Sequence, residues 1–168
     1  DKINVNLNKP EYIIPEYLEA ELTVWTTKPL PRAGIEFNIL TAENKMYAEV
    51  AKNVTDIKEG KNTISLKLSV RDFTAGRYKL TAKIGGKEIT SSLFDVYTPE
   101  GYKAKVRKGI ANLKQSVLLI GAQITDLEKT QIDCSYPKIA VTIAENFLNY
   151  AQDDFNQNET ARAKDAVK

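Results

Sequence analysis

Apolar and polar residues alternate along most of the first hundred positions of this 168-residue chain. The alternation is carried by seven short runs, at residues 3–7, 18–24, 35–39, 47–50, 64–68, 78–84 and 89–96. Successive side chains of a strand point to opposite faces, so each run predicts a strand with one buried face. Gly85 and Gly86 predict a tight hairpin, and a slip in the alternation near Ser92 predicts a β-bulge. Together these signals predict an antiparallel two-sheet β-sandwich of about seven strands over residues 1–97.

The period changes after residues 98–101, which read Thr-Pro-Glu-Gly. From there, apolar residues recur at alternating steps of four and three, and they are Val106, Ile110, Leu113, Val117, Ile120, Ile124 and Leu127. This spacing is a heptad seam, and it predicts a helix over about 100–129. We expect the seven seam residues to form a helix interface, either within one chain or between two chains.

Two further helical patterns follow, over about 137–154 and about 158–168. Ser135 and Asn158 are the expected N-caps of these two helices. Residues 98–168 are therefore expected to form a helical hairpin or a small bundle, so that the whole chain is of the α+β class in two parts. The last pattern reaches Lys168 without a stop signal, and we expect the helical region to continue in a longer protein.

Short motifs in the first part resemble those of immunoglobulin-like domains. Residues 71–80 are similar to the turn that leads into a tyrosine-led strand, and this resemblance implies that the Tyr78 hydroxyl bonds to backbone upstream. Residues 12–18 and 29–35 resemble the approaches to the second and third strands of macroglobulin-like bacterial modules, although the first lacks their glycine. The resemblance implies adhesion, spacing or binding, and it carries over no catalytic residue.

A softer resemblance covers the helical part. Residues 132–137, with the segments around 151–154 and 161–163, resemble helical spacers of large multidomain bacterial extracellular proteins. Some of those proteins carry glycoside hydrolase domains elsewhere in the chain. This resemblance implies an accessory module and an extracellular or cell-surface location.

Residue usage argues against several classes of function. The chain has 24 basic and 22 acidic residues, balanced in both parts, so it lacks the basic excess of nucleic-acid-binding proteins. It has no histidine, which removes the commonest general base and the commonest metal ligand. The single cysteine, Cys134, cannot form an internal disulfide or a CxxC site. We therefore expect no enzymatic activity, no catalytic residue, no bound metal and no cofactor.

Membrane insertion is not expected. The longest apolar block covers residues 117–120, far short of the ~20 residues that a transmembrane helix needs. The chain begins with Asp1 rather than methionine, which fits either a piece of a larger protein or a processed protein. The lack of a visible signal peptide therefore says little about location.

Trp25 is the candidate ligand contact. It ends the second strand pattern, beside Thr26 and Thr27. We expect it to pack in the core or between domains. The alternative is an exposed tryptophan whose ring stacks on a sugar, in a chain that also has eight tyrosines.

Two charged clusters are candidate binding sites. One cluster has the spacing of the ligands in a calcium-binding loop, and its members are Asp154, Asn156, Asn158 and Asp165. Glu159 stands where such a loop needs glycine, so we expect a turn between two helices instead. The other is a basic stretch that we interpret as a solvated helix face, with contact to an anionic surface as the alternative; its members are Lys103, Lys105, Arg107, Lys108 and Lys114. Because cations are unfavourable near a helix start, we expect acidic groups of the sandwich to face them.

The sequence thus favours a non-catalytic structural or interaction module, whose partners are neighbouring domains or another protein. The first alternative is a carbohydrate-binding accessory module of a larger glycoside hydrolase. A further alternative is self-association through the heptad helix, which makes the protein a monomer or a helix-mediated dimer.

Overall fold

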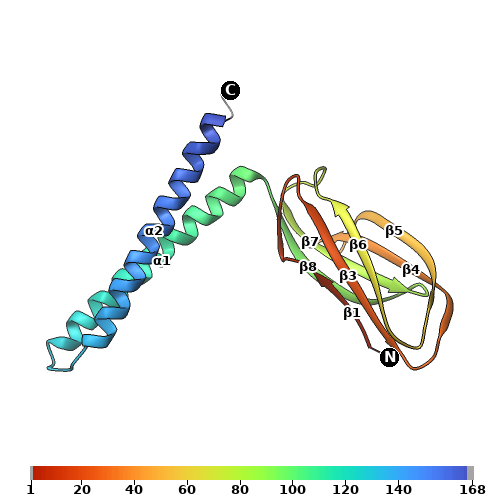
Figure 1. Cartoon of the computed structure of the whole chain (residues 1–168), viewed down its shortest axis with the longest axis horizontal. Helices are drawn as coiled ribbons and strands as arrows, with labels where there is room; N and C mark the ends of the chain where they lie inside the picture. The colour runs from red at the N-terminus through yellow and green to blue at the C-terminus, as the bar shows by residue number, and fades with distance from the viewer. Residues whose placement is uncertain (1, 166–168) are drawn as a thin grey trace. The chain divides into compact units, whose positions relative to one another are not determined.

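The described residues form eight strands in two sheets followed by two helices. Figure 1 shows the ribbon of this computed structural model, with the strands as arrows and the helices as coils. The structure describes residues 2–165, without the side chains of 87–89 and 160–165. The chain divides into two compact units, residues 1–102 and 103–168, which are described separately below. The α+β class and the N-terminal β-sandwich are as predicted.

The first unit is a two-layer β-sandwich. One sheet has the order β1-β3-β6 and the other the order β2-β8-β7-β4-β5. The strands are β1 (Lys2–Leu7), β2 (Glu11–Ile13), β3 (Tyr17–Thr26), β4 (Leu30–Thr41), β5 (Met46–Ile57), β6 (Gly60–Ser69), β7 (Gly76–Ile84) and β8 (Lys87–Tyr97). All pairings are antiparallel except that of β2 with β8. The short strand β2 was not predicted, because three residues are too few to display an alternation.

The sandwich core follows the predicted alternation. Every second residue of β3 is buried, and the facing strands contribute the other half of the core. Side chains below 2% exposure include Leu18, Leu22, Ile35, Ile39 and Leu80. Such complete burial on both inner faces is what makes a two-sheet sandwich stable without a disulfide.

The predicted tyrosine corner is confirmed. The Tyr78 hydroxyl lies 2.9 Å from the backbone oxygen of Thr74, to which it donates. The Tyr78 ring is 4% exposed and contacts the rings of Tyr47, Phe73 and Phe94. Burial is the main reason why the pKa of Tyr78 is raised. The hydroxyl therefore stays protonated as a hydrogen-bond donor.

The predicted hairpin at Gly85-Gly86 is also confirmed, since both residues have positive φ between β7 and β8. The predicted bulge position was wrong. Ser92 pairs regularly with Leu80, and the register instead shifts where Ala82 faces Thr90 and Lys83 faces Glu88. The apparent slip arose because Leu93 is an apolar residue on the outer face, where it is 60% exposed.

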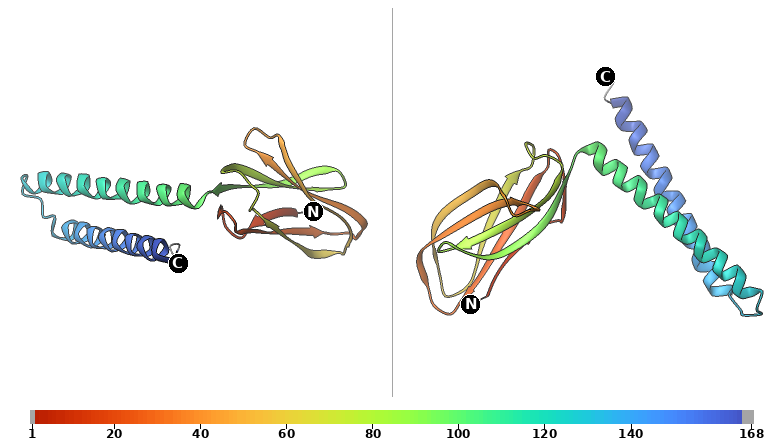
Figure 2. Two further views of the ribbon diagram at one scale, coloured as in Figure 1. Left: turned by 90° about the horizontal axis from the view of Figure 1, so that it is seen from above. Right: turned by 180° about the vertical axis from the view of Figure 1, so that it is seen from behind.

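The second unit contains most of α1 (Pro99–Glu128) and all of α2 (Ser135–Asp165), which run antiparallel side by side (Figure 2). The start of α1 is capped by Thr98, whose hydroxyl accepts the Gly101 N–H at 3.0 Å. The N-terminus of α2 is capped by Asp133 rather than by Ser135, because the Asp133 carboxylate accepts both the N–H and the hydroxyl of Ser135. These bonds lower the pKa of Asp133.

The expected break between a second helix at 137–154 and a third at 158–168 is absent. A single helix, α2, runs through this region to Asp165, and residues 166–168 lie outside the described residues. The polar residues taken for a turn bond along the helix instead. Gln152 donates to Asn156 and Asn158 donates to Asp154, both in the i,i+4 geometry. No glycine or proline lies between Lys138 and Asp165 to interrupt the helix.

Candidate functional site

Trp25 lies on the outer face of the three-stranded sheet and not in the core. Along β3, Leu22, Val24 and Thr26 point inward, so Trp25 points outward and is 51% exposed. Interpretation of Trp25 as a core residue of the sandwich was therefore wrong, because the alternation along β3 is regular up to its last residue. Ligand contact by Trp25 stays a prediction.

The immediate neighbours of Trp25 are cationic and polar. Lys2 of β1 and Lys61 of β6 stand directly opposite Trp25 in the sheet register, one on each side. Cross-strand neighbours on one face lie about 5 Å apart at Cβ, so both ammonium groups can reach a ligand stacked on the indole. Lys2, Thr26 and Thr27 join Trp25 around an open depression of about 580 Å³.

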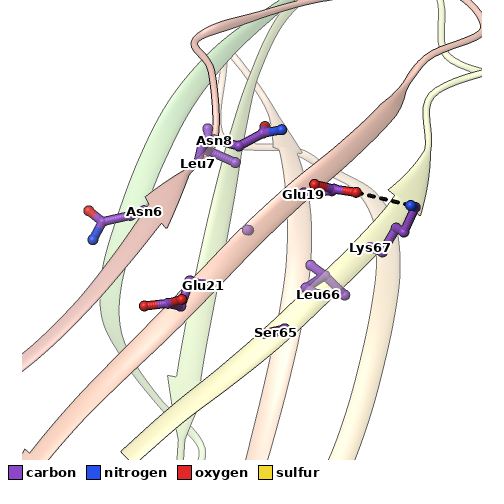
Figure 3. A pocket seen from close by; sticks show the side chains of 9 residues that line it. Asn6, Leu7, Asn8, Glu19, Glu21, Ser65, Leu66 and Lys67 are labelled. Atoms are coloured by element: carbon purple, nitrogen blue, oxygen red, sulfur yellow. Dashed lines mark ion pairs between the residues drawn. The ribbon is translucent and has the colours of Figure 1, made fainter.

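A second depression lies farther along the same outer face, as Figure 3 shows. It also has a volume of about 580 Å³, and its polar lining includes Asn6, Glu19, Glu21, Ser65 and Lys67. Glu19 and Lys67 form an ion pair at 3.0 Å. Amide, carboxylate and hydroxyl groups in one row can donate to and accept from sugar hydroxyls.

Tyr17 is a second exposed aromatic residue of this face, at the opposite end of β3 from Trp25. The Lys67 ammonium lies 5.1 Å from the centre of the Tyr17 ring and partly covers it. Trp25 is therefore the better stacking surface of the two. Sequence reasoning identified Trp25 but missed the polar row, because cross-strand register is needed to bring Asn6, Glu21 and Ser65 together.

The heptad residues of α1 do not all lie at the contact with α2. Ile110 and Ile124 are buried and Val106 and Val117 are half-buried, but Leu113, Ile120 and Leu127 are 57%, 49% and 47% exposed. The contact instead includes the half-buried residues Lys114, Gly121 and Glu128, each four residues after a seam residue. Val141 of α2 packs against α1 at the level of Gly121, where an added Cβ atom would lie 3.8 Å from the Val141 side chain.

The predicted seam is therefore divided between two surfaces. On α2, half-buried residues that face α1 recur at helical spacing, as Val141, Ala144, Leu148, Gln152 and Phe155. Outside this contact, α2 exposes Ile143, Phe147 and Tyr150, with Tyr136 and Ile139 nearer its start. Phe147 and Tyr150 are more than 70% exposed. Clusters of exposed apolar side chains are a common feature of interaction surfaces.

Charge pairs join the two helices at the end of the hairpin that is opposite to its loop. Glu159 of α2 pairs with Lys103 at 3.0 Å and also with Arg107 of α1. The guanidinium of Arg107 also lies 5.5 Å from the centre of the Phe155 ring. Helix α2 thus supplies a carboxylate to the basic start of α1, whereas the expectation that acidic groups of the sandwich face these residues stays a prediction. The hydrogen bond from Lys103 is the main cause of the lowered pKa of Glu159.

The remaining candidates form no site. The calcium-loop spacing of residues 154–165 lies on the continuous helix α2, which cannot wrap its side chains around an ion. Among the side chains that the structure describes, no three of His, Cys, Asp or Glu gather where they could hold a metal. Cys134 is a buried free thiol at the turn between α1 and α2. Neither described helix is long and apolar enough to cross a membrane.

Comparison with known proteins gives a fold likeness only. No protein-family model and no curated protein matches the chain. Among solved structures, the CARDB domain of PF1109 from Pyrococcus furiosus has 10% identity and a TM-score of 0.44, covering 56% of this chain and 85% of that domain. A β-glucosidase from Erythrobacter marinus has 9% identity and a TM-score of 0.47, covering 56% and 15%.

A third similar structure is the alkylpurine DNA glycosylase AlkC of Pseudomonas fluorescens, with 18% identity and a TM-score of 0.45. It is covered over 29% of its length, and this chain over 56%. This chain thus spans only a small share of the two enzymes and most of the CARDB domain. At these identities the matches assign no ligand or activity. The first unit is a two-sheet β-sandwich, and its immunoglobulin-like and macroglobulin-like character stays a prediction.

Proposed function

We propose that this protein is a non-catalytic interaction module, in which the β-sandwich is a stable spacer and the helical hairpin associates with other helices. The observation that carries the proposal is the exposure of apolar residues outside the α1–α2 contact. Leu113, Ile120 and Phe147 are each about half exposed or more, and they are among several large apolar residues that the two helices expose. Complete burial of a fully exposed side chain of this kind gains about 1.5–3 kcal/mol, and roughly half of that is left to gain for these partly exposed residues, so a partner that covers several of them binds favourably.

A hydrophobic dye tests this proposal. The full chain is expected to bind bis-ANS, and the triple variant Leu113→Ser, Ile120→Ser, Phe147→Ser is expected to lose most of the fluorescence. The matched control is Val54→Ser with Leu93→Ser, which removes comparably exposed apolar residues from the sandwich. Dye binding that is lost in the control and kept in the triple variant would contradict the proposal.

A second candidate function rests on the outer face of the β1-β3-β6 sheet. There the exposed ring of Trp25 adjoins Lys2 and Lys61 and lies on the same face as the polar row around Glu21. Stacking of a sugar ring on indole, with hydrogen bonds from the polar row, would make this face a glycan-binding surface. The flanking lysines favour sugars that carry a carboxylate or sulfate.

Isothermal titration with neutral and acidic oligosaccharides tests this second function. Trp25→Ala is expected to abolish binding while changing the free energy of unfolding by less than about 0.5 kcal/mol, because the side chain is exposed. Leu93→Ala, on the outer face of the other sheet, serves as the matched control. Binding that survives Trp25→Ala would remove Trp25 from the site.

We also propose an extracellular or cell-surface location for the parent protein. The support is the resemblance to spacers of extracellular bacterial proteins. Degradation of the native protein by protease added to intact cells is the expected result. Full protection until the cells are lysed would count against this location.

A further inference from the structure

The two helices of the hairpin have a broad apolar face on one side of the plane that contains both helix axes. On α1, the residues that face α2 include Ile110, Val117 and Ile124, which are buried or half-buried. Three positions after each of them stands Leu113, Ile120 or Leu127. Each residue of a helix is rotated by about 100° from the last, so a step of three places these leucines and isoleucine roughly 60° to one side of the contact. All three are about half exposed.

The matching positions on α2 point to the same side. Helix α2 runs antiparallel to α1, so an offset of the same sign on each helix leads to the same side of the hairpin. The exposed residues that come one position before an inward residue, or three after one, are Ala140, Ile143, Phe147 and Ala151, followed by the polar residues Asp154 and Asn158 toward the end of the helix. We give the name apolar face to six residues of the two helices: Leu113, Ile120, Leu127, Ala140, Phe147 and Ala151.

The other side of the hairpin is polar by the same construction. The residues one position after the inward residues are Ala111, Leu118 and Thr125 of α1, and Thr142, Glu145, Asn149, Asp153 and Asn156 of α2. Only Leu118 among them is a large apolar residue, and it is 66% exposed. A hairpin with one apolar and one polar side has the pattern of half a four-helix bundle.

The distribution of charge along the hairpin indicates which pair of helices could form the other half of a four-helix bundle. Residues 103–114 of α1 include five basic and no acidic residues, whereas residues 145–159 of α2 include four acidic and no basic residues. The Lys103–Glu159 pair and the approach of Val141 to Gly121 show that these two stretches lie at the same levels along the hairpin. A partner must therefore present an acidic helix over α1 and a basic helix over α2.

A second copy of this chain meets that requirement. A two-fold axis parallel to the helices places α1 of one protomer over α2 of its partner, antiparallel and at the same level. The basic stretch of each protomer then faces the acidic stretch of the other, with Lys108 level with Asp154. Thirty residues at 1.5 Å and two helices of about 10 Å give a face on the order of 900 Å², close to the ~800 Å² that each partner contributes to a stable interface.

We infer that the apolar face binds the same face of a second copy, forming an antiparallel four-helix bundle from two hairpins. This inference rests on the proposed function and names its partner. The apolar residues of the two copies exclude water at the centre, and the opposite charges at the rim fix the relative direction of the hairpins. An arrangement with the loops at opposite ends would place the basic stretch of α1 away from the acidic stretch of α2.

Light scattering after size-exclusion chromatography of the full chain tests the inference. The expected result is a dimer whose dissociation constant rises by about tenfold or more in Leu113→Ser and in Ile120→Ser, since each removes a buried apolar side chain. Leu118→Ser is the matched control, because it removes an equally exposed leucine from the polar side of the same helix. Circular dichroism of each variant checks that the helices still form.

Charge reversal tests the direction of the pairing. Asp154→Lys alone is expected to weaken the dimer, and addition of Lys108→Glu to the same chain is expected to restore it. A dimer that is insensitive to the Leu113 and Ile120 substitutions would overturn the inference.

These outcomes distinguish the self-association of the chain from its more general role as an interaction module. A monomer at all concentrations that still binds bis-ANS through Leu113, Ile120 and Phe147 would overturn the second copy but keep the interaction module. A monomer without such dye binding would overturn both.

Discussion

The two units of this protein use their apolar residues in opposite ways. In the sandwich, sixteen apolar residues form a continuous buried core. In the described part of the hairpin, only Ile110, Ile124 and Cys134 are buried, while eleven large apolar residues are exposed. The sandwich is thus complete in itself, whereas the hairpin has apolar surface that its own two helices do not cover.

The difference follows from geometry. A sheet has two faces, and the two sheets of a sandwich cover each other's inner face entirely. A helix in a two-helix hairpin contacts its neighbour along one narrow stripe, so an apolar band wider than about 100° must extend beyond the contact. Both helices here have such a wide band. This contrast is why we assign the interaction to the hairpin and the spacer role to the sandwich.

The largest expected effect comes from deleting matched leucines in the two units. Leu22→Ala in the sandwich is expected to lower the free energy of unfolding by about 2–5 kcal/mol, because the side chain is fully buried. Leu113→Ala in the hairpin is expected to change it by less than about 0.5 kcal/mol at dilutions where the protein is monomeric. Urea unfolding, followed by far-ultraviolet circular dichroism, measures both. Equal losses would mean that Leu113 is covered within the monomer.

A smaller effect is expected for the tyrosine corner. Tyr78→Phe removes the donor to the Thr74 carbonyl and keeps the ring contacts, so the sandwich is expected to lose about 1.5 kcal/mol. Tyr150→Phe, at an exposed position of α2, is the matched control and is expected to have no measurable effect. The two variants together test whether polar groups are as tightly specified in the hairpin as in the sandwich.

The sequence predicted the sandwich more completely than the hairpin, because the sandwich follows from local patterns whereas the helix contact does not. Alternation marked nearly all strands, and the turn of residues 71–80 identified Tyr78, because both signals are local. The heptad of α1 correctly predicted a helix, but it could not show that Leu113, Ile120 and Leu127 lie outside the contact with α2. That division depends on which residues of α2 pack against α1, and the spacing within α1 carries no information about them. The polar row beside Trp25 was likewise invisible without the register of β1, β3 and β6.

The hairpin also differs from the sandwich in how it depends on pH, and this gives the smallest expected effect. Glu159 has a lowered pKa, chiefly because it accepts a hydrogen bond from Lys103, with a further contribution from Arg107. A carboxyl group with a lowered pKa in the folded state stabilises that state above its ordinary pKa near 4.5. This stabilisation is lost as the pH falls through the lower, folded-state pKa.

Lowering the pH below the ordinary pKa range of carboxyl groups is therefore expected to separate the start of α1 from the end of α2 before the sandwich core is affected. Hydrogen exchange at amides around Lys103 and Phe155 is expected to speed up several-fold, while amides of β3 and β7 stay protected. Glu159→Gln should show the faster exchange already at neutral pH and respond less to acid. Glu145→Gln, at an exposed position on the same helix, is the control for a general change in helix charge. Unchanged exchange in Glu159→Gln would mean that the packing of Ile110 and Phe155, and not the ion pairs, holds this end of the hairpin together.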